Sequence, residues 1–507
     1  MSQPLVPICV IGAGTMGRGI AQVALASGHP VHLVDPDAAQ LAAAESEIIT
    51  RLTRKDPAAG ALVEERLDLL TDLTQARTDP RTIVIEAILE RLDVKQTVLR
   101  RAADHFGTSC ILATNTSSLS VTAIAAGVPD PSRVVGMHFF NPVPVMRLVE
   151  VVRGLQSDDE AVDAITELAE RWGKSVAHVR SVPGFIVNRV ARAFYGESLR
   201  LVEERAGTPE TIDELMRAAG GFRMGPFELM DLIGNDVNFA VTRTVWASYD
   251  YDPRFAPSLI QSEIVAAGRL GRKTGQGFFE YGESVERPLP RAADVDAAAQ
   301  ARDITMILHG SDDQLGTLLT RAGVEFGRTE SEDPHIEFVG AGSVLITRGL
   351  TAREETSRRG EPVLLLDRCL APSTATAVAL ASTDAPLADA VIALLHRAGV
   401  RAFPVADVPG LVVARILSMI ANEAWETAYH DVASPGDIDN AMVLGTNYPM
   451  GPFAWSAQWS SHRVLELLDA LWSSYHDPRY RASFALRTAA PASSLANRQA
   501  KEARSHV

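Results

Sequence analysis

Cysteine is scarce in this 507-residue sequence. The three cysteines, Cys9, Cys110 and Cys369, lie far apart and form no CxxC pair. Single cysteines at such distances suggest neither a disulfide framework nor a zinc cluster. We therefore expect no metal site, and the composition fits a reducing compartment.

An early basic stretch and long apolar runs are also missing. The first basic residue is Arg18, so the start lacks the positively charged region of a secretory signal peptide. The apolar run from Leu411 to Ile420 is interrupted by Arg415, and no charge-free run reaches the length of a membrane span. These features predict a cytoplasmic protein that is not inserted in a membrane.

Positive charge is in deficit. The chain has 48 Lys and Arg against 63 Asp and Glu, a net charge of −15. This balance argues against a general nucleic-acid or anionic-membrane binder, whose surface would be basic. It leaves room for an anionic substrate held by a local cluster of cations. The hydrophobic share of 46% is ordinary for a folded protein, and the length predicts three or four domains of ~150 residues each.

The first third of the chain alternates between short apolar runs and segments with helical spacing. Such alternation predicts a parallel sheet with helices on both faces. A polar helical stretch is expected over 37–69, with an interruption near Asp56-Pro57. The expected strands are Ile8–Ile11, Val31–Val34, Thr82–Ile85, Ser109–Ala113 and Val134–Met137, and the first expected helix covers 15–27.

A repeat divides the rest of the chain. The segment Pro183-Gly184-Phe185-Ile186-Val187 recurs as Pro409-Gly410-Leu411-Val412-Val413, a shift of 226 residues (409 − 183), and Met224-Gly225-Pro226-Phe227 recurs at Met450 with the same shift. A constant offset between separated segments indicates two copies of one helical domain. We predict four domains: α/β (1–182), helical (183–285), a linker with a degenerate α/β segment (286–405), and a second helical copy (406–507).

A glycine-rich turn follows the first expected strand. It reads Gly12-Ala13-Gly14-Thr15-Met16-Gly17 and precedes a helix. In this context the glycines allow a tight turn, close approach of a pyrophosphate and packing of helix on strand. Asp35 ends the second strand, where an acid binds the adenosine ribose, and no Arg for a 2′-phosphate follows. The motif favours NAD over NADP; taken alone, the glycines would also suit an ordinary turn.

A second group of residues surrounds His138. His138 follows a strand that should end at the ligand-binding edge of the sheet. A hairpin centred near residue 144 would set His138 beside Glu150, and a carboxylate behind an imidazole fixes its tautomer and stabilises its charged form. Spacing alone is equally consistent with a buried, hydrogen-bonded His and a surface Glu.

With the glycine-rich turn, the segment around His138 and the further motifs given below, the sequence resembles the NAD-dependent L-3-hydroxyacyl-CoA dehydrogenase family. The shared motifs span residues 8 to 281 in the family's order, and the tandem continuation to 507 resembles its longer bacterial members, especially those of phenylacetate degradation, which act on 3-hydroxyadipyl-CoA. The motifs, as they stand here, are VIGAGTMG, VIEAILERLDVK, ATNTSSLS, GMHFFNPVPVMRLVEVV, PGFIVNR, MGPFEL and GRLGRKTGQGFFEY.

The resemblance implies a fold and a set of roles. It implies a Rossmann-like NAD-binding domain followed by an all-α domain, with reversible oxidation of a 3-hydroxyacyl-CoA. His138 would be the general base and Glu150 its partner, while Ser117 and Asn188 would complete the substrate pocket. The positions implied to bind NAD are Gly12, Gly14, Thr15, Met16, Gly17, Asp35, Glu90, Lys95, Asn115 and Asn141.

The phosphates of coenzyme A need cations. Arg51, Arg54 and Lys55 cluster on the helical arm after the first βαβ unit, and they fit a CoA contact and an ordinary solvated helix face equally well. Gly271-Arg272-Lys273-Thr274-Gly275 lacks the order of a phosphate-binding loop. The resemblance makes it a structural loop before a closing strand, Phe278 to Tyr281.

The second half has lost the chemical residues. Ala414 stands where the 226-residue shift places Asn188, and no HFFNP-like segment follows residue 300. Asp312 and Asp313 occupy the start of the helix after Gly310, where they would repel a pyrophosphate. We predict a catalytically silent copy that packs on the first helical domain as an internal pseudo-dimer, with further self-association left open.

Two other functions compete with a 3-hydroxyacyl-CoA dehydrogenase. One is a non-catalytic dinucleotide-binding or structural protein on the same fold, since fold alone does not fix function. The other is an NAD-dependent dehydrogenase of a small free hydroxyacid. The set of His138, Glu150, Ser117 and Asn188 favours the acyl-CoA enzyme. The acyl chain is not readable from the sequence.

Overall fold

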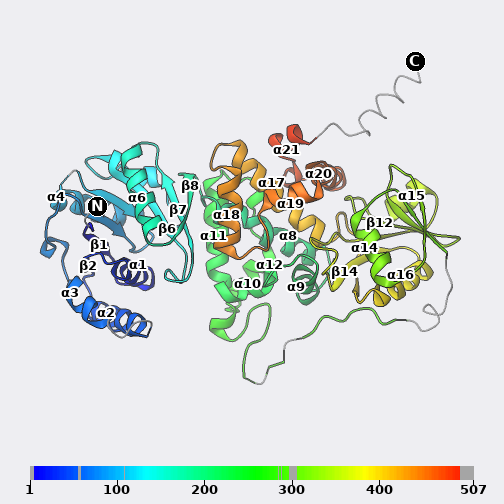
Figure 1. Ribbon diagram of the computed structural model, residues 1–507, viewed down its shortest axis with the longest axis horizontal. Helices are drawn as coiled ribbons and strands as arrows, with labels where there is room; N and C mark the ends of the chain where they lie inside the picture. The colour runs from blue at the N-terminus through cyan, green and yellow to red at the C-terminus, as the bar shows by residue number, and fades with distance from the viewer. Residues whose placement is uncertain are drawn as a thin grey trace, which may run out of the picture. The chain divides into compact units, whose positions relative to one another are not determined.

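The chain divides into two compact units. The computed structural model describes residues 5–54, 59–107, 109–283, 285–286, 288–295 and 305–490. One unit consists of Met1–Arg189 together with His430–Thr446, and the other of Val190–Tyr429 together with Asn447–Val507 (Figure 1). A short segment of the second half therefore belongs to the same unit as the N-terminal sheet.

The first unit is built on an eight-stranded sheet of order β3-β2-β1-β4-β5-β6-β7-β8. All neighbouring strands are parallel except β6 and β7, which form an antiparallel pair. The strands are β1 (Ile8–Ile11), β2 (Val31–Val34), β3 (Leu67–Leu70), β4 (Ile83–Glu86), β5 (Ile111–Thr114), β6 (Val134–Phe139), β7 (Leu148–Arg153) and β8 (Ser175–Arg180).

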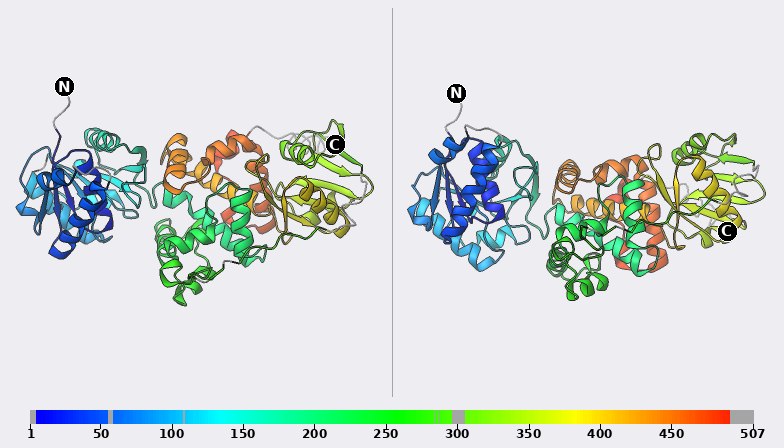
Figure 2. Two further views of the ribbon diagram at one scale, coloured as in Figure 1. Left: turned by 60° about the horizontal axis from the view of Figure 1, so that its bottom comes forward. Right: turned by 90° about the horizontal axis from the view of Figure 1, so that it is seen from below.

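Helices cover both faces of this sheet (Figure 2). They are α1 (Thr15–Ala26), α2 (Ala38–Thr53), α3 (Ala59–Arg66), α4 (Leu92–Phe106), α5 (Val121–Ala125), α6 (Asp159–Arg171) and α7 (Val187–Val190), which reaches the boundary of the unit. The expected helical stretch 37–69 was wrong at its end, because Leu67–Leu70 forms the edge strand β3 and pairs with β2. The interruption expected at Asp56-Pro57 lies outside the described residues.

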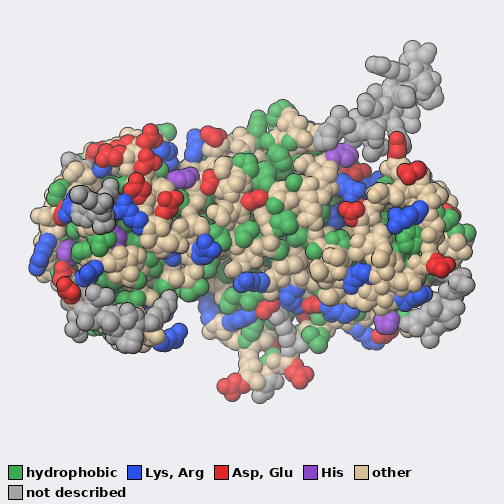
Figure 3. All heavy atoms as spheres, in the orientation of Figure 1, with side chains coloured by type: hydrophobic (Ala, Val, Ile, Leu, Met, Phe, Trp, Pro, Cys, Tyr) green, Lys and Arg blue, Asp and Glu red, His purple; other side chains and the backbone are tan. Residues whose placement is uncertain are grey.

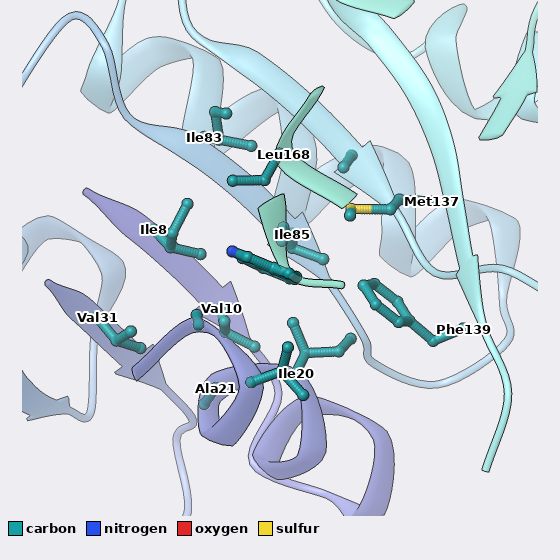
Figure 4. Close-up of a cluster of buried hydrophobic side chains, with 14 of the residues drawn as sticks. Ile8, Val10, Ile20, Ala21, Val31, Ile83, Ile85, Met137, Phe139 and Leu168 are labelled. Atoms are coloured by element: carbon teal, nitrogen blue, oxygen red, sulfur yellow. The ribbon is translucent and has the colours of Figure 1, made fainter. Parts of the chain in front are cut away.

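A single apolar core holds the sheet and one helix layer together. Ile8, Val10 and Ile85 on the strands face Ile20 of α1 and Leu168 of α6 (Figure 4). Strands β1 and β4 are buried along their whole length, as expected for a parallel sheet covered on both sides. The core fixes where the carboxyl ends of β1, β4, β5 and β6 meet, and the candidate site lies at these ends.

The second unit contains most of both helical copies. Helices of the first copy are α8 (Arg192–Glu203), α9 (Pro209–Ala218), α10 (Pro226–Ile233), α11 (Asn235–Ser248) and α12 (Leu259–Ala266). Those of the second copy are α17 (Val413–Tyr429), α19 (Pro452–Trp459), α20 (Ser461–Tyr475) and α21 (Phe484–Ala489), while α18 (Pro435–Thr446) lies in the first unit. The closing strand expected at Phe278–Tyr281 was wrong: isolated bridges pair Gln276 with Gly271 and Glu280 instead.

Helices α8 and α17 pack against each other through a buried ion cluster. The side chain of Arg415 on α17 is fully buried, and its Nε donates to Glu197 of α8 at 2.5 Å. Its two Nη groups each donate to Glu204 at 2.8 Å. Residues separated by more than 200 positions thus share one cluster of charges.

A second, smaller α/β layer completes this unit. Its seven-stranded sheet has the order β10-β9-β11-β12-β13-β14-β15. The elements are β9 (Met306–His309), β10 (Gly327–Thr329), β11 (His335–Phe338), β12 (Gly342–Ile346), β13 (Val363–Leu366), β14 (Ala377–Ser382), β15 (Arg401–Pro404), α14 (Asp313–Ala322), α15 (Ala352–Arg359) and α16 (Ala385–Arg397). Strand β11 is antiparallel to both of its neighbours, and β13 and β14 form a further antiparallel pair near one edge, as β6 and β7 do in the first sheet.

Side chains of both charges are interspersed over the face that Figure 3 presents. No helix among the described residues is long and apolar enough to cross a bilayer. Within the same residues, no group of three or more His, Cys, Asp or Glu side chains is arranged to hold a metal ion.

Candidate active site

The glycine-rich turn joins β1 to α1, and each glycine has its own steric reason. A Cβ on Gly12, whose φ is +105°, would lie 2.6 Å from the carbonyl oxygen of Ala87, and one on Gly17 would lie 1.7 Å from that of Gly12. A Cβ on Gly14 would meet no described atom within 4 Å. Gly12 and Gly17 therefore allow the turn and the helix packing, while Gly14 leaves the backbone open to a ligand.

A cavity of about 690 Å³ lies over this turn. Its lining includes Gly12, Gly14, Thr15, Met16 and Asp35, so five of the predicted cofactor-binding residues come together. The start of α1 has no side-chain cap, which leaves its first N–H groups to bind an anion. An open glycine and an uncapped helix start beside an acid fit a dinucleotide.

Asp35 is held in place by the backbone around it. Its Oδ2 accepts the N–H of Ala13 at 2.8 Å, and its Oδ1 accepts the N–H of Asp37 at 3.0 Å. Each carboxylate oxygen keeps a second lone pair for a ribose hydroxyl. Arg101, which sequence reasoning missed, also lines the cavity and pairs with Asp72 at 3.1 Å.

His138 and Glu150 lie directly opposite each other on β6 and β7, as the expected hairpin requires. The imidazole Nδ1 and Glu150 Oε2 are 2.6 Å apart. The other carboxylate oxygen accepts the backbone N–H groups of Ile186 and Val187, each at 3.0 Å. Glu150 is fully buried, so these donors replace the water that the carboxylate lost.

This arrangement determines what the imidazole can do. A carboxylate can only accept hydrogen bonds, so the bond between Glu150 and the imidazole is donated by Nδ1. In a neutral His138 the other nitrogen, Nε2, then carries a free lone pair. Among the described residues no protein hydrogen bond to Nε2 occurs. The ring of Phe140 lies 4.5 Å and that of Phe185 5.8 Å from the His138 ring, centroid to centroid. A base with an apolar wall can remove a proton from a substrate hydroxyl.

The loop that carries Ser117 is tied to Glu90. Glu90 Oε1 accepts the hydroxyl of Thr116 at 2.6 Å and the N–H groups of Ser117 and Ser118 at 2.9 and 3.1 Å. Burial by itself would raise the pKa of Glu90, but the charge of Lys95 and these hydrogen bonds outweigh it and lower the pKa below its usual value. Glu90 is therefore an anion that shapes the loop.

Lys95 is buried between two carboxylates. Its Nζ lies 2.6 Å from Glu86 and 3.2 Å from Glu90. Glu86 ends β4 and lies within the motif VIEAILERLDVK, but the sequence assigned it no role of its own. It also accepts the hydroxyl of Thr114 at 2.7 Å. The Lys95 side chain is 1% exposed, so it does not lie on a solvated helix face.

Three asparagines occupy different places around the histidine. Asn115 Oδ1 accepts the N–H of Phe139 at 2.8 Å, which links the ends of β5 and β6. Asn188 on α7 donates through Nδ2 to the carbonyl oxygen of Ser117 at 3.4 Å. Asn141 is exposed. Ser117, Asn188 and His138 thus belong to one unit, and a hydrogen bond joins Asn188 to the Ser117 loop.

The turn between His138 and Glu150 is fastened by a lysine that sequence reasoning missed. Lys174 Nζ donates to the carbonyl oxygens of Val143 and Met146, at 2.5 and 2.8 Å. Burial lowers the pKa of Lys174 to about 8. A buried ammonium satisfied by carbonyl groups holds the hairpin in the register that pairs His138 with Glu150.

The predicted CoA cations are only partly described. Arg51 is half exposed and pairs with Glu47 one turn earlier on α2, which also pairs with Arg18. Arg54 is exposed at the end of α2, and Lys55 lies outside the described residues. The pairing of Arg51 agrees with a solvated helix face and leaves a CoA contact untested.

The corresponding place in the second sheet carries a different carboxylate. Asp367 follows β13, and its side chain accepts the N–H groups of Val412, Val413 and Ala414 at 3.1, 2.6 and 3.0 Å. Val412 and Val413 are the repeat equivalents of Ile186 and Val187, so Asp367 does for the second copy what Glu150 does for the first. Burial raises the pKa of this carboxyl to about 6, although the N–H groups act against the rise.

The turn that would hold phosphates in the second copy is closed by its own acid. Asp312 caps α14 by accepting the N–H groups of Gln314 and Leu315 at 3.0 and 3.3 Å. Its other oxygen binds Arg463 at 2.9 Å. The helix start is therefore already satisfied, as the sequence predicted from Asp312 and Asp313.

Comparison with known families covers most of the chain. Residues 7–182 match the NAD binding domain of 3-hydroxyacyl-CoA dehydrogenase, and residues 184–281 and again 410–505 match its C-terminal domain. Residues 344–409 match the reduced Rossmann-fold domain of 3-hydroxybutyryl-CoA dehydrogenase. The chain belongs to the 3-hydroxyacyl-CoA dehydrogenase family. It has an N-terminal Rossmann-like domain that binds NAD, a helical C-terminal domain, a second sheet region and a repeated C-terminal domain.

Two of three relatives match nearly the whole chain, and the third matches about half of it. A 3-hydroxyadipyl-CoA dehydrogenase of Escherichia coli is 41% identical over 488 residues, 95% of this chain and 96% of the relative. The pig mitochondrial hydroxyacyl-coenzyme A dehydrogenase is 37% identical and covers 54% of this chain. The crystal structure of an Escherichia coli 3-hydroxybutyryl-CoA dehydrogenase superposes with a TM-score of 0.85 at 38% identity, over 96% of this chain and 98% of that one.

Proposed function

We propose that this chain catalyses the reversible, NAD-dependent oxidation of an L-3-hydroxyacyl-CoA to the 3-oxoacyl-CoA. The observation that carries the proposal is the buried His138–Glu150 pair, 2.6 Å apart, at the sheet edge that also carries the nucleotide turn. A binding protein without chemistry has no need of an imidazole fixed in one tautomer by a buried carboxylate. The names of the full-length relatives support the same reaction class.

Each candidate residue has a separate role in the oxidation. His138 Nε2 takes the proton of the 3-hydroxyl group, and Glu150 stabilises the imidazolium that results. Ser117 orients the substrate oxygen, and the Nδ2 of Asn188, next to the Ser117 loop, completes the pocket. NAD, when bound, supplies the acceptor for the hydride. Proton removal and hydride loss then leave a carbonyl at C3.

Cofactor binding is assigned to two sets of residues. Gly12, Gly14 and the first N–H groups of α1, at Thr15 and Met16, hold the pyrophosphate, with Gly17 behind them. Asp35 binds the adenosine ribose, which favours NAD. On the nicotinamide side the assigned residues are Glu90, Lys95, Asn115 and Asn141.

The second half is proposed to be catalytically silent. Asp367 in place of the His–Glu pair, Ala414 in place of Asn188 and the self-capped Asp312 support this assignment. We assign residues 1–182 to the NAD-binding domain, 183–285 and 406–507 to the helical copies, and 286–405 to the linker and degenerate α/β segment. The Arg415 cluster between α8 and α17 supports an internal pseudo-dimer of the helical copies. Cytoplasmic location stays a proposal, supported by three buried free thiols.

The decisive experiment compares two histidine variants. His138→Gln is expected to fold, to bind NADH with unchanged affinity and to lose ~10²–10⁴-fold in turnover of 3-hydroxybutyryl-CoA, the usual contribution of a general base. His178→Gln, at an exposed position on β8 of the same unit, is the matched control and is expected to retain full activity. Full activity of His138→Gln would refute the mechanism.

The acyl chain is tested in the same assay. The relatives' names point to two short acyl groups, so kcat/KM is measured for 3-hydroxybutyryl-CoA and 3-hydroxyadipyl-CoA side by side. A small free 3-hydroxyacid is the third substrate. Activity with the free acid at the level of the thioesters would overturn the assignment to acyl-CoA.

A further inference from the structure

Helix α18 belongs to the second half by sequence but packs on the first sheet. It contacts β7 and β8 within the first unit. The chain that leads into it is joined to the end of β8, where the N–H of Arg180 donates to the carbonyl oxygen of Val432 at 2.9 Å. The half without catalytic residues thus contributes a helix to the sheet that carries His138 and Glu150.

Gly445, in the last turn of α18, is the point of closest approach. A Cβ there would lie 2.7 Å from Leu148 Cδ2, 3.1 Å from Val187 Cγ2 and 3.7 Å from Phe140 Cε1. The first distance is closer than real Cβ contacts, and the second is closer than most of them. The absent side chain of Gly445 is therefore what lets the helix reach these three residues.

Each of the three neighbours leads directly to the catalytic pair. The ring of Phe140 packs on the imidazole of His138 at 4.5 Å between centroids. The N–H of Val187 donates to Glu150 at 3.0 Å. Leu148 starts β7 two residues before Glu150 and so lies on the same face of the strand. A displacement at Gly445 would reach the base and its carboxylate through one intervening residue.

The second unit contains the reciprocal arrangement. Helix α9, the repeat equivalent of α18, packs on β14 of the second sheet, and the carbonyl oxygens of Ala218 and Ala219 accept the N–H groups of Thr376 and Leu370 at 3.2 and 2.9 Å. Ala219 is the repeat equivalent of Gly445. Each helical copy therefore places its second helix on the sheet that belongs to the other half.

The residue sizes differ between the two arrangements. In the first arrangement the ring of Phe140 lies beside Gly445, whereas in the second the backbone N–H of Leu370 donates to the carbonyl oxygen of Ala219. The helix position is correspondingly smaller in α18, glycine instead of alanine. A large ring beside the smallest residue keeps the packing volume balanced, as close-packed interiors require.

We propose that Gly445 is a positioning residue of the first-half active site, through which the silent half holds the His138–Glu150 pair in its productive geometry. The proposal rests on the proposed function of that pair. It gives the second half a role in the reaction itself. A catalytic pair shifted by a fraction of an ångström loses rate without losing its ligands.

The test adds a single methyl group at two places on α18. Gly445→Ala is expected to lower kcat about tenfold or more, with Kd for NADH and KM for the acyl-CoA changed less than about twofold. Gly436→Ala is the matched control, because its Cβ would meet only Ser434 Oγ, at 3.9 Å, and it receives the same gain in helix propensity. Gly445→Val is expected to lower kcat further, since its larger side chain reaches toward Phe140.

A rescue variant separates positioning from general damage. Leu148→Ala removes the nearest atoms, so the double variant Gly445→Ala/Leu148→Ala is expected to recover more activity than the product of the single effects predicts. A kcat of Gly445→Ala equal to that of Gly436→Ala, or a loss that Leu148→Ala leaves unchanged, would overturn the proposal.

A measurement without substrate keeps the two proposals apart. The imidazole signal of His138, assigned by its absence in His138→Gln, is recorded by NMR at one fixed pH. Gly445→Ala is expected to change the chemical shift of this signal, and Gly436→Ala is expected to leave it in place. An inactive wild-type chain with a signal that still moves would refute the proposed function alone, and an unmoved signal would refute the positioning role.

Discussion

Removal of the Arg415 guanidinium tests how the two helical copies hold together. Arg415 is fully buried, and its guanidinium donates to Glu197, Glu204 and the hydroxyls of Tyr475 and Tyr480. Arg415→Met keeps most of the volume and deletes the charge. Glu197, whose side chain is 1% exposed, then has lost its cation inside the protein.

The expected loss is large because a buried charge is left without its counterion. Breaking such a pair from one side costs about 3–5 kcal/mol of unfolding free energy. At a urea dependence of about 3 kcal/mol per M, the unfolding midpoint of the second unit falls by about 1 M or more. Five of the six tryptophans belong to this unit, so tryptophan fluorescence reports mainly its unfolding.

Two further variants make the result decisive. Glu197→Gln in the Arg415→Met background is expected to recover part of the loss, because it removes the unpaired charge. Arg487→Met breaks the half-exposed pair with Asp469 and is expected to cost less than about 1 kcal/mol. An Arg415→Met chain as stable as Arg487→Met, or no recovery in the double variant, would refute the reasoning.

Three further predictions concern the first unit. Asp35→Ala is expected to lower kcat/KM for NAD more than for NADP while keeping kcat at saturating NAD; an unmutated chain that prefers NADP would contradict it. Glu150→Gln is expected to reduce turnover less than His138→Gln, and equal or greater loss would contradict a purely supporting role. The pKa of Lys174 is about 8 in the folded chain and 10.5 in the unfolded chain, so between these pH values the unfolded chain binds more protons than the folded one. The free energy of unfolding is therefore expected to rise from about pH 8 to 10.5. Urea unfolding at both ends of this range is expected to show that rise relative to Lys174→Met, and parallel curves would exclude it.

Local chemistry made several features predictable. The glycine turn, the strands Ile8–Ile11 and Val31–Val34 and the pairing of His138 with Glu150 all follow from short-range patterns. A turn that needs glycines, a fully apolar strand and a two-proline hairpin each specify their own geometry within about fifteen residues. The 226-residue repeat could also be recognised in the sequence, because both copies kept the Met-Gly-Pro-Phe segment that starts α10 and α19.

Features that depend on distant partners were missed. Leu67–Leu70 reads as part of a helix, and only pairing with β2 makes it a strand. Phe278–Tyr281 reads as a strand, but only isolated bridges form there among the described residues, because the N–H groups of Phe278 and Phe279 donate to Asp231. Glu86 lies within a shared motif and Lys174 within none, and the role of each comes from the groups that lie beside it after folding.

The sequence by itself determined the residues of the candidate site: the glycine-rich turn, the pairing of His138 with Glu150, and the absence of these residues from the repeat. Only the tertiary structure decided on which of the two sheets helices α9 and α18 pack. Helix α18 packs on the first sheet because Gly445 leaves room for Phe140, Leu148 and Val187, residues some 260 to 305 positions away in the chain. Periodicity reports which face of a helix is apolar, and it carries no information on which sheet will cover that face.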